Sequence, residues 1–267
     1  MPKGREARAA RALRKREPEF VETDRNLLGL RGHSSSAIAL HVLRDLLSLK
    51  KPAARMLSRK NDIRPFEDAS SLEFLCEKND CSAFAYCSSS KKRPDNIVLG
   101  RTFDHHVLDM VELGVEDFAP IELFKGPKAR IGSHPAFIFQ GDAWARDSSL
   151  IRLQSLVIDV WGGRDLTKLS LAGLDHVIVL TAIDTLSSDG SGGAGAGAAA
   201  TAGGPLSSAA YKGDIHWRTY ALVFSRVGGD TPKVDLVAMG PSIDMKLRRV
   251  QLASDDLYRT ACRQPAG

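Results

Sequence analysis

Apolar residues recur at helical spacing in several stretches of the chain. Residues 34–49 and 148–161 each place leucine, valine and isoleucine side chains on one face, so we expect two amphipathic helices there. Serines that can cap a helix begin both stretches, and Gly162 ends the second. A shorter helix is expected at 70–78, and the mixed apolar spacing of 107–124 favours a further helix.

Short apolar runs bounded by turn residues predict strands. The polar stretch Leu57–Asp68 contains Pro65 and has no period, so we expect an extended segment that wraps a surface. Gly240-Pro241 is expected to end the last strand. The expected strands are 81–88, 96–103, 135–140, 176–183, 215–227 and 233–239.

A strand–helix–strand order occurs twice along the chain, which favours a mixed α/β (α+β) domain of two similar halves. We place the domain at 31–250, with halves at about 31–126 and 127–250. Residues 187–210 are rich in Gly, Ala and Ser, so we expect a disordered insertion between two strands. A basic N-terminal arm (1–30) and a C-terminal tail (251–267) flank the domain.

Charge is distributed unevenly over the 267 residues, whose net charge is +5. Residues 1–64 hold 16 Lys/Arg and 7 Asp/Glu, whereas the remainder holds 21 and 25. A basic front on a mildly acidic body suggests a polyanion partner. The arm is either a solvated tail, a segment that becomes helical against RNA, or a nuclear address; its cations include Arg8, Arg11, Arg14, Lys15 and Arg16.

Catalytic and metal-binding motifs are weak in this sequence. Gly190-x-Gly192-x-x-Gly195 lies in a glycine-rich tract, where a chance match to a dinucleotide-binding motif is expected. Cys81 and Cys87 would lie on one strand face roughly 20 Å apart, too far to share a metal ion. We therefore expect no cofactor, no metal, no catalytic residue and no membrane span, and keep an enzyme with a discontinuous site as an unfavoured alternative.

Basic residues gather in three clusters of the body and are the candidate RNA contacts. Without a sequence-reading RNA motif, recognition would act through the backbone and shape of the nucleic acid. The candidates are Arg59, Lys60 and Arg64 in the extended segment, Lys91, Lys92 and Arg93 at a turn, and Lys246, Arg248 and Arg249 after Gly240-Pro241.

Several of these segments resemble one known family. They are LSLKKP (47–52), SRKNDIRPFED (58–68), EKNDCS (77–82), SSKKRPDN (89–96), FIFQG (137–141) and VDLVAMGPSIDMKLRR (234–249). They are similar to the ribosome production factor 2 family, whose members are eukaryotic ribosome assembly proteins built on a Brix domain. The similarity runs from the KREPEFVET segment (15–23) to about Arg249.

The resemblance implies a fold and a role. Brix domains consist of two halves that each resemble an anticodon-binding domain. The family forms a heterodimer with the regulator of ribosome synthesis protein and recruits 5S rRNA with its two ribosomal proteins into the pre-60S particle. It acts in the nucleolus, supports 27S pre-rRNA processing, and is not an enzyme. Ser242 stands where the family usually has Arg, which weakens phosphate binding by that motif.

A scaffold remains as the alternative function. In that case the chain would bind only proteins in the nucleolus, and the basic arm would serve as a nuclear address. Direct binding of 5S or pre-60S rRNA by the basic clusters distinguishes the two interpretations. The sequence does not select among the nine candidate cations of the body.

Overall fold

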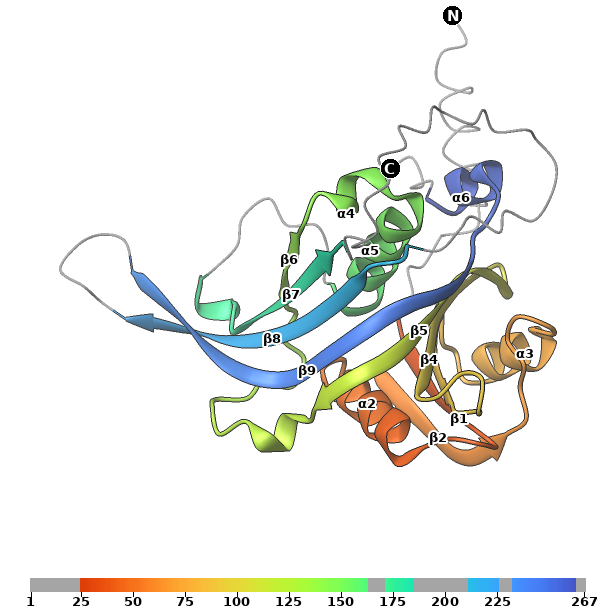
Figure 1. Ribbon diagram of the computed structural model, residues 1–267, viewed down its shortest axis with the longest axis horizontal. Coiled ribbons are helices and arrows are strands. Elements are labelled where there is room, and N and C mark those ends of the chain that lie inside the picture. Colours follow the sequence, from red (N-terminus) through yellow and green to blue (C-terminus); the bar gives the residue numbers. More distant parts are fainter. Residues whose placement is uncertain (1–24, 163–170, 185–210, 226–231, 263–267) are drawn as a thin grey trace, which may run out of the picture.

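The computed structural model describes residues 25–162, 171–184, 211–225 and 232–262. The expected insertion at 187–210 lies outside the described residues, as does the arm up to residue 24. The described chain forms a mixed α/β fold, in which helices pack on both sides of one large curved sheet (Figure 1).

The sheet has the strand order β2-β1-β3-β4-β5-β9-β8-β7-β6 in the described residues. β1 runs parallel to β2 and β3, and β6 runs parallel to β7; the other neighbours are antiparallel. The strands are β1 (Leu27–Gly32), β2 (Ala54–Asn61), β3 (Ala83–Ser88), β4 (Asn96–Phe103), β5 (His106–Ala119), β6 (Ala136–Gln140), β7 (His176–Ile183), β8 (Asp214–Ser225) and β9 (Lys233–Gln251).

The helices begin at side-chain caps or tight turns. Ser36 caps the first long helix by accepting a hydrogen bond from the Ala39 N–H, and Asp147 caps the second through Ser149 and Leu150. The helices are α2 (Ala37–Ser48), α3 (Ser70–Lys78), α4 (Ala143–Arg146), α5 (Ser148–Trp161) and α6 (Asp255–Ala261), with 3-10 turns at Ile121–Leu123 and Leu171–Gly173.

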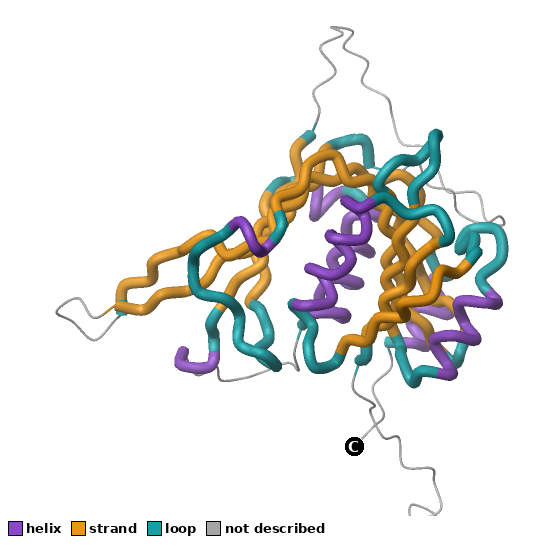
Figure 2. Tube along the Cα trace, turned by 90° about the horizontal axis from the view of Figure 1, so that it is seen from below, coloured by secondary structure: helices purple, strands orange, loops and turns teal. Residues whose placement is uncertain are grey.

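The main core lies where α2 and α5 meet in the hollow of the sheet (Figure 2). The Trp161 Nε1–H donates to the Leu46 carbonyl across the two helices at 3.0 Å. The Trp161 ring meets Trp217 of β8 edge-on, with ring centroids 5.2 Å apart. A smaller core lies on the opposite face of the sheet, where Leu72 and Cys76 of α3 pack on β1, β3, β4 and β5. Helices thus pack on both faces of the sheet.

Three expectations about elements were wrong. Residues 107–124, expected as a helix, mostly form β5, which is buried on both faces and therefore lacks the two-residue period of a half-buried strand. β9 continues through Gly240-Pro241, where it bends instead of ending. The expected surface segment 57–68 begins as the second half of the edge strand β2 and turns into a loop only after Asn61.

Other expectations were confirmed. The two long helices, the helix at 70–78 and the strands at 96–103 and 176–183 occur within three residues of their expected bounds. β1 and α6 lie where no element was expected. The similarity of the two halves to each other and to anticodon-binding domains stays a prediction, and so do the domain bounds.

Candidate nucleic-acid interface

The candidate cations of the body converge at one end of the sheet. β1, β2 and β3 are parallel, so their carboxyl ends meet there. Arg59 and Lys60 lie at the end of β2, and Lys91–Arg93 lie in the turn that follows β3. The antiparallel neighbours bring Lys246 and Arg249 to the same end, opposite Gly114 and Glu112 of β5. We call this end, with residues 59–64, 89–96 and 246–249, the basic rim.

The turn after β3 is held against the start of α2. The Ser89 N–H donates to the Ser34 carbonyl at 2.8 Å, and Ser36 hydrogen-bonds to the Asp95 carboxylate. Asp95 itself has a φ of +44°, a conformation that Asp tolerates in turns. Because β1 lies between β2 and β3, this turn is two inter-strand distances, about 10 Å, from β2. Its lysines therefore lie near Arg59 and Lys60 without touching them.

Arg249 neutralises a buried carboxylate. The Glu112 side chain is 1% exposed, and the Arg249 guanidinium binds it through Nε and through Nη2, at 3.0 Å from Oε1. Asn96 donates to the same carboxylate at 2.7 Å, while the Arg93 Nη1 lies 3.9 Å away. Arg249 also stacks on the ring of Phe66, 4.1 Å from its centroid. The main role of Arg249 is therefore to stabilise the fold.

Arg248 holds the basic turn in place. It occupies a β-bulge of β9, so its side chain lies on the same face as Arg249 and crosses Gly114. Its Nη1 donates to the Pro94 carbonyl at 2.8 Å and to the Asn96 Oδ1 at 3.1 Å. A Cβ at Gly114 would stand 2.2 Å from the arginine Cζ, so a side chain at this position would displace the guanidinium. Arg248 thus links β9 to the segment that carries Lys91 and Lys92.

Lys246 and Arg64 are exposed but paired. Lys246 Nζ lies 3.6 Å from Glu116 and 3.7 Å from Asp214, and its side chain is 47% exposed. Arg64 pairs with Glu67 at 3.1 Å, and this hydrogen bond raises the pKa of its guanidinium. Exposed pairs of this kind contribute little stability and exchange readily with another anion. Both residues can therefore turn toward a phosphate.

The side chains of four rim cations form no hydrogen bond or ion pair with any residue that the structure describes. They are Arg59, Lys60, Lys91 and Lys92, and all four are exposed. Sequence reasoning missed a further arginine at this end of the sheet, Arg31, because it did not recognise β1; the Arg31 Nε donates to Ser35 Oγ at 3.1 Å. The arm residues Arg8, Arg11, Arg14, Lys15 and Arg16 lie outside the described residues.

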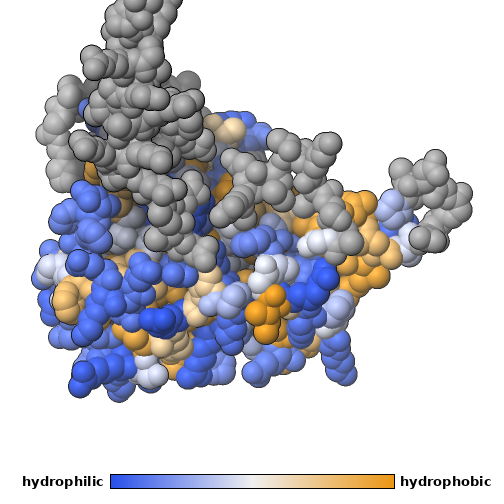
Figure 3. Space-filling model, turned by 180° about the vertical axis from the view of Figure 1, so that it is seen from behind, coloured by the Kyte–Doolittle hydropathy of each residue, from blue (hydrophilic) through white to orange (hydrophobic). Residues whose placement is uncertain are grey.

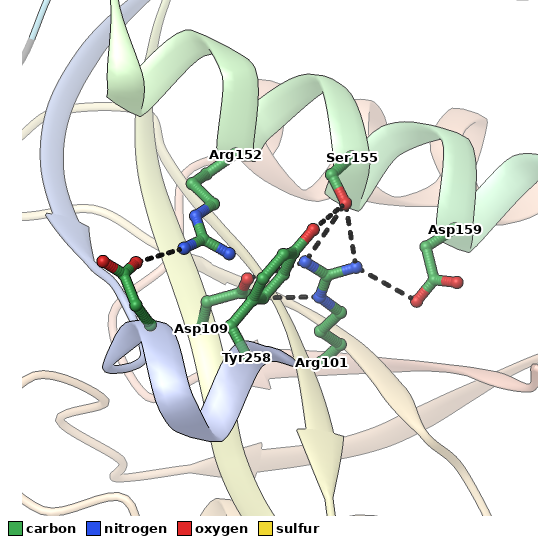
Figure 4. Close-up of polar contacts among 7 residues, drawn as sticks. Arg101, Asp109, Arg152, Ser155, Asp159 and Tyr258 are labelled. Atoms are coloured by element: carbon green, nitrogen blue, oxygen red, sulfur yellow. Dashed lines mark hydrogen bonds and ion pairs between the residues drawn. The ribbon is translucent and has the colours of Figure 1, made fainter. Parts of the chain in front are cut away.

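A second cluster of charged residues joins α6 to the rest of the fold (Figure 4). Arg101 of β4 is nearly buried and binds Asp109 through both carboxylate oxygens, at 2.8 and 2.7 Å. The Tyr258 ring of α6 lies over Arg101 and under Arg152, whose Cζ is 3.4 Å from the ring centroid. The Tyr258 hydroxyl lies 2.9 Å from Ser155 Oγ. This cluster fixes α6 to β4 and α5.

The described residues contain no group of three or more His, Cys, Asp and Glu side chains that could hold a metal ion.

Burial raises the pKa of the Cys76 thiol to about 12, which keeps it protonated and unreactive. The expectation that Cys81 and Cys87 share a strand face was wrong: Cys81 precedes β3 and packs with Cys76, whereas Cys87 packs in the main core. No helix in the described part of the chain is long and apolar enough to cross a membrane.

Comparisons with known proteins agree with this fold. The Brix domain model matches residues 32–249, so the chain is a Brix-domain protein. The human Ribosome production factor 2 homolog is 40% identical over 97% of this chain and 75% of its own length. The homolog of Schizosaccharomyces pombe is 37% identical over 98% of this chain and 77% of its own length. The Ribosome biogenesis protein RPF2 of Saccharomyces cerevisiae is 36% identical over 98% of this chain and 72% of its own length.

These similarities show that the chain belongs to the ribosome production factor 2 family and is a ribosome biogenesis factor. A solved structure, the probable ribosomal biogenesis protein from Aeropyrum pernix K1, aligns with a TM-score of 0.45 and 11% identity over 84% of this chain and 96% of its own.

Proposed function

We propose that this chain binds ribosomal RNA through the basic rim while a second surface binds a protein partner. The observation that supports RNA binding is the gathering of Arg59, Lys60, Lys91 and Lys92, none of them neutralised by a described residue, at one end of one sheet. Cations placed in this way contact phosphates and release counterions. Arg248 and Arg249 position the rim instead of contacting RNA themselves.

Membership of the family supports the choice of RNA and of its destination. The proposed ligand is 5S rRNA, delivered with its two ribosomal proteins into the pre-60S particle, in support of 27S pre-rRNA processing in the nucleolus. The proposed partner is the regulator of ribosome synthesis protein, which forms a heterodimer with this chain. No catalytic step is part of the proposal.

The hairpin of β8 and β9 supplies a surface for the protein partner. It projects from the body, and three cross-strand pairs put only apolar side chains on one of its faces (Figure 3). Leu236 is 54% exposed and Val234 is 48% exposed. A projecting apolar face of this kind marks an interaction site. The pairs are Tyr220 with Ala238, Leu222 with Leu236 and Phe224 with Val234.

Ultraviolet cross-linking of the purified full chain to 5S rRNA tests the RNA contact. We expect cross-linked peptides to contain residues 59–60 and 91–92, because these cations reach the phosphates first. The scaffold alternative, in which only proteins are bound, predicts no RNA cross-link in the body of the chain. RNA cross-links confined to α5 or α6 would contradict the proposal that the basic rim is the RNA-binding surface.

A further inference from the structure

A cavity of about 450 Å³ opens to solvent between the end of β2 and α3, beside the basic rim. A volume of this size falls within the range of sites that bind small ligands. The lining mixes polar and apolar side chains. It consists of Asn61, Asp62 and Ile63 of the rim and of Ser70, Ser71, Phe74 and Leu75 of α3.

Phe74 gives the cavity an exposed aromatic ring. Its exposed fraction is 59%, whereas every other Phe, Tyr and Trp side chain that the structure describes is buried or half-buried. On α3 it lies between Leu72 and Cys76, which face the smaller core, so the helix turns Phe74 away from that core. A ligand that covers this ring would gain the free energy of burying apolar surface.

Asp62 gives the same cavity a carboxylate that is free to accept hydrogen bonds. Its exposed side chain forms no hydrogen bond or ion pair with the described part of the chain. The next two acids along the chain are engaged: Asp68 accepts from the Ser70 N–H at 2.9 Å, and Glu67 pairs with Arg64 at 3.1 Å. A free carboxylate near an exposed ring suits a planar group that carries hydrogen-bond donors.

Cations border the cavity on both sides. Lys60 precedes Asp62 by two residues, so their Cα atoms are at most about 7 Å apart. On the α3 side, the Lys78 Nζ lies 5.7 Å from the centroid of the Phe74 ring. A nucleotide would use both features, because its phosphate needs a cation and its base can stack on a ring. An apolar peptide would use the ring alone, so the surroundings favour RNA.

We propose that this cavity binds one unstacked guanine base of the RNA, stacked on Phe74, with its phosphate on Arg59 or Lys60. Guanine fits because its adjacent N1–H and N2–H groups can both donate to the two oxygens of Asp62. Uracil offers one such donor, and adenine and cytosine offer one amino group. The inference rests on the proposed RNA binding and adds a base contact to its phosphate contacts.

Binding of 5S rRNA to the full chain at several salt concentrations tests the stacking. Phe74→Ala should weaken binding at least about fivefold, the effect of losing one base stack. The slope of log K against log salt should stay the same, since no phosphate contact is lost. Phe74→Trp should restore the affinity, and Ile151→Ala, 44% exposed on α5, is the control that should change nothing.

Two results would overturn the stacking. An affinity of Phe74→Ala equal to that of the unmodified chain would show that the cavity holds something other than RNA, such as a protein segment. A weaker affinity with a shallower slope would show that Phe74 only positions the rim cations.

Labelled RNA heptamers test the choice of base by fluorescence anisotropy. Heptauridylate with guanine at its centre should bind the full chain at least about fivefold more tightly than heptauridylate itself. Inosine at the centre, which lacks the N2 amino group, should lose most of this preference. Asp62→Asn removes one of the two acceptors and should reduce the ratio of the two affinities. Glu67→Gln, outside the cavity lining, should leave the ratio unchanged. Equal affinities for the guanine and uracil heptamers would contradict the guanine site.

The double variant Arg59→Gln with Lys60→Gln separates this inference from the proposed function. If it makes the salt slope of 5S rRNA binding shallower while Phe74→Ala binds as tightly as the unmodified chain, the phosphate contacts stand and the base site is refuted. If the unmodified chain does not bind 5S rRNA, both are refuted.

Discussion

Glu112 and Arg249 show how a single buried charge determines the role of a cation. The carboxylate is 1% exposed, so it needs an opposite charge within the fold, and Arg249 provides it with two contacts. The sequence placed Arg249 among the RNA contacts because the pattern KLRR reveals charge but not its buried partner. Cations without such a partner, such as Lys91, remain available to RNA.

Replacement of Arg249 by Met should destabilise the fold by about 3–5 kcal/mol, because it leaves a buried carboxylate without its main partner. Urea unfolding followed by circular dichroism measures the loss. The double variant Arg249→Met with Glu112→Gln should recover part of it, since the unpaired charge is then gone. Arg59→Met, at an exposed and unpaired position, should change the stability by less than about 0.5 kcal/mol. A loss of less than about 0.5 kcal/mol in the stability of Arg249→Met would contradict the structural role of Arg249.

Asp175 makes the stability depend on acid pH. Burial raises the pKa of its carboxyl, but hydrogen bonds from His176, the Arg130 backbone N–H and Ser133 lower it more, to about 2 from 3.8. Because the folded pKa is the lower one, Asp175 stabilises the fold fully above about pH 4. That contribution, about 2 kcal/mol, is lost as the pH falls toward 2.

Asp175→Asn should therefore flatten the fall of the unfolding free energy between about pH 4 and pH 2. Denaturant titrations at several pH values measure it. Asp142→Asn serves as the control, because the Asp142 side chain is 82% exposed and, among the described residues, forms an ion pair only with the exposed Arg146. If the unfolding free energy of Asp175→Asn fell between pH 4 and pH 2 as steeply as that of the unmodified chain, the fold would not hold this carboxyl in its ionised form.

Among the elements, α6 is attached to the fold by few side chains, and Tyr258 makes most of these contacts. It has seven residues, too few for a helix that is stable alone, and Tyr258 fixes it to α5 between Arg101 and Arg152. Composition could not reveal this contact, because the partners lie more than 100 residues apart in the sequence. Within the tail expected at 251–267, residues 255–261 thus form a helix that packs on the fold.

Tyr258→Ala should release α6 while the sheet stays folded. The stacked ring and the hydroxyl contact with Ser155 together contribute about 1–2 kcal/mol. Amide exchange in α6 should accelerate about tenfold, as measured by mass spectrometry. Leu257→Ala, at a position 43% exposed, is the matched control and should leave the exchange unchanged. Equal exchange in both variants would show that Tyr258 does not secure the helix.

The sequence predicted the two long helices because each has one apolar face, with caps at its start. It failed at β5, where Met110, Val111 and Leu113 are all buried and no alternation exists. It failed at β9 because Gly240-Pro241 is a strong break signal that the fold accommodates with a φ of +74° at the glycine. Local patterns cannot show burial on both faces or a bend inside a continuous strand.

For the whole molecule, the basic rim depends on strand order. Residues 59–60 and 91–92 come together only because β1 lies between β2 and β3 in a parallel arrangement, and the sequence did not predict β1. The charge count of +9 over residues 1–64 therefore indicated a polyanion partner without locating it. The fold locates a candidate surface that draws cations from both the basic front and the body.

The salt dependence of 5S rRNA binding tests the central claim, which is that free rim cations contact phosphates. The variant with glutamine at Arg59, Lys60, Lys91 and Lys92 is compared with the unmodified chain, and a double variant with glutamine at Lys125 and Arg259, exposed outside the rim, is the control. Loss of four contacts should make the slope of log K against log salt shallower by about 3. The control should keep the original slope. Equal slopes for the rim variant and the unmodified chain would contradict the proposed interface.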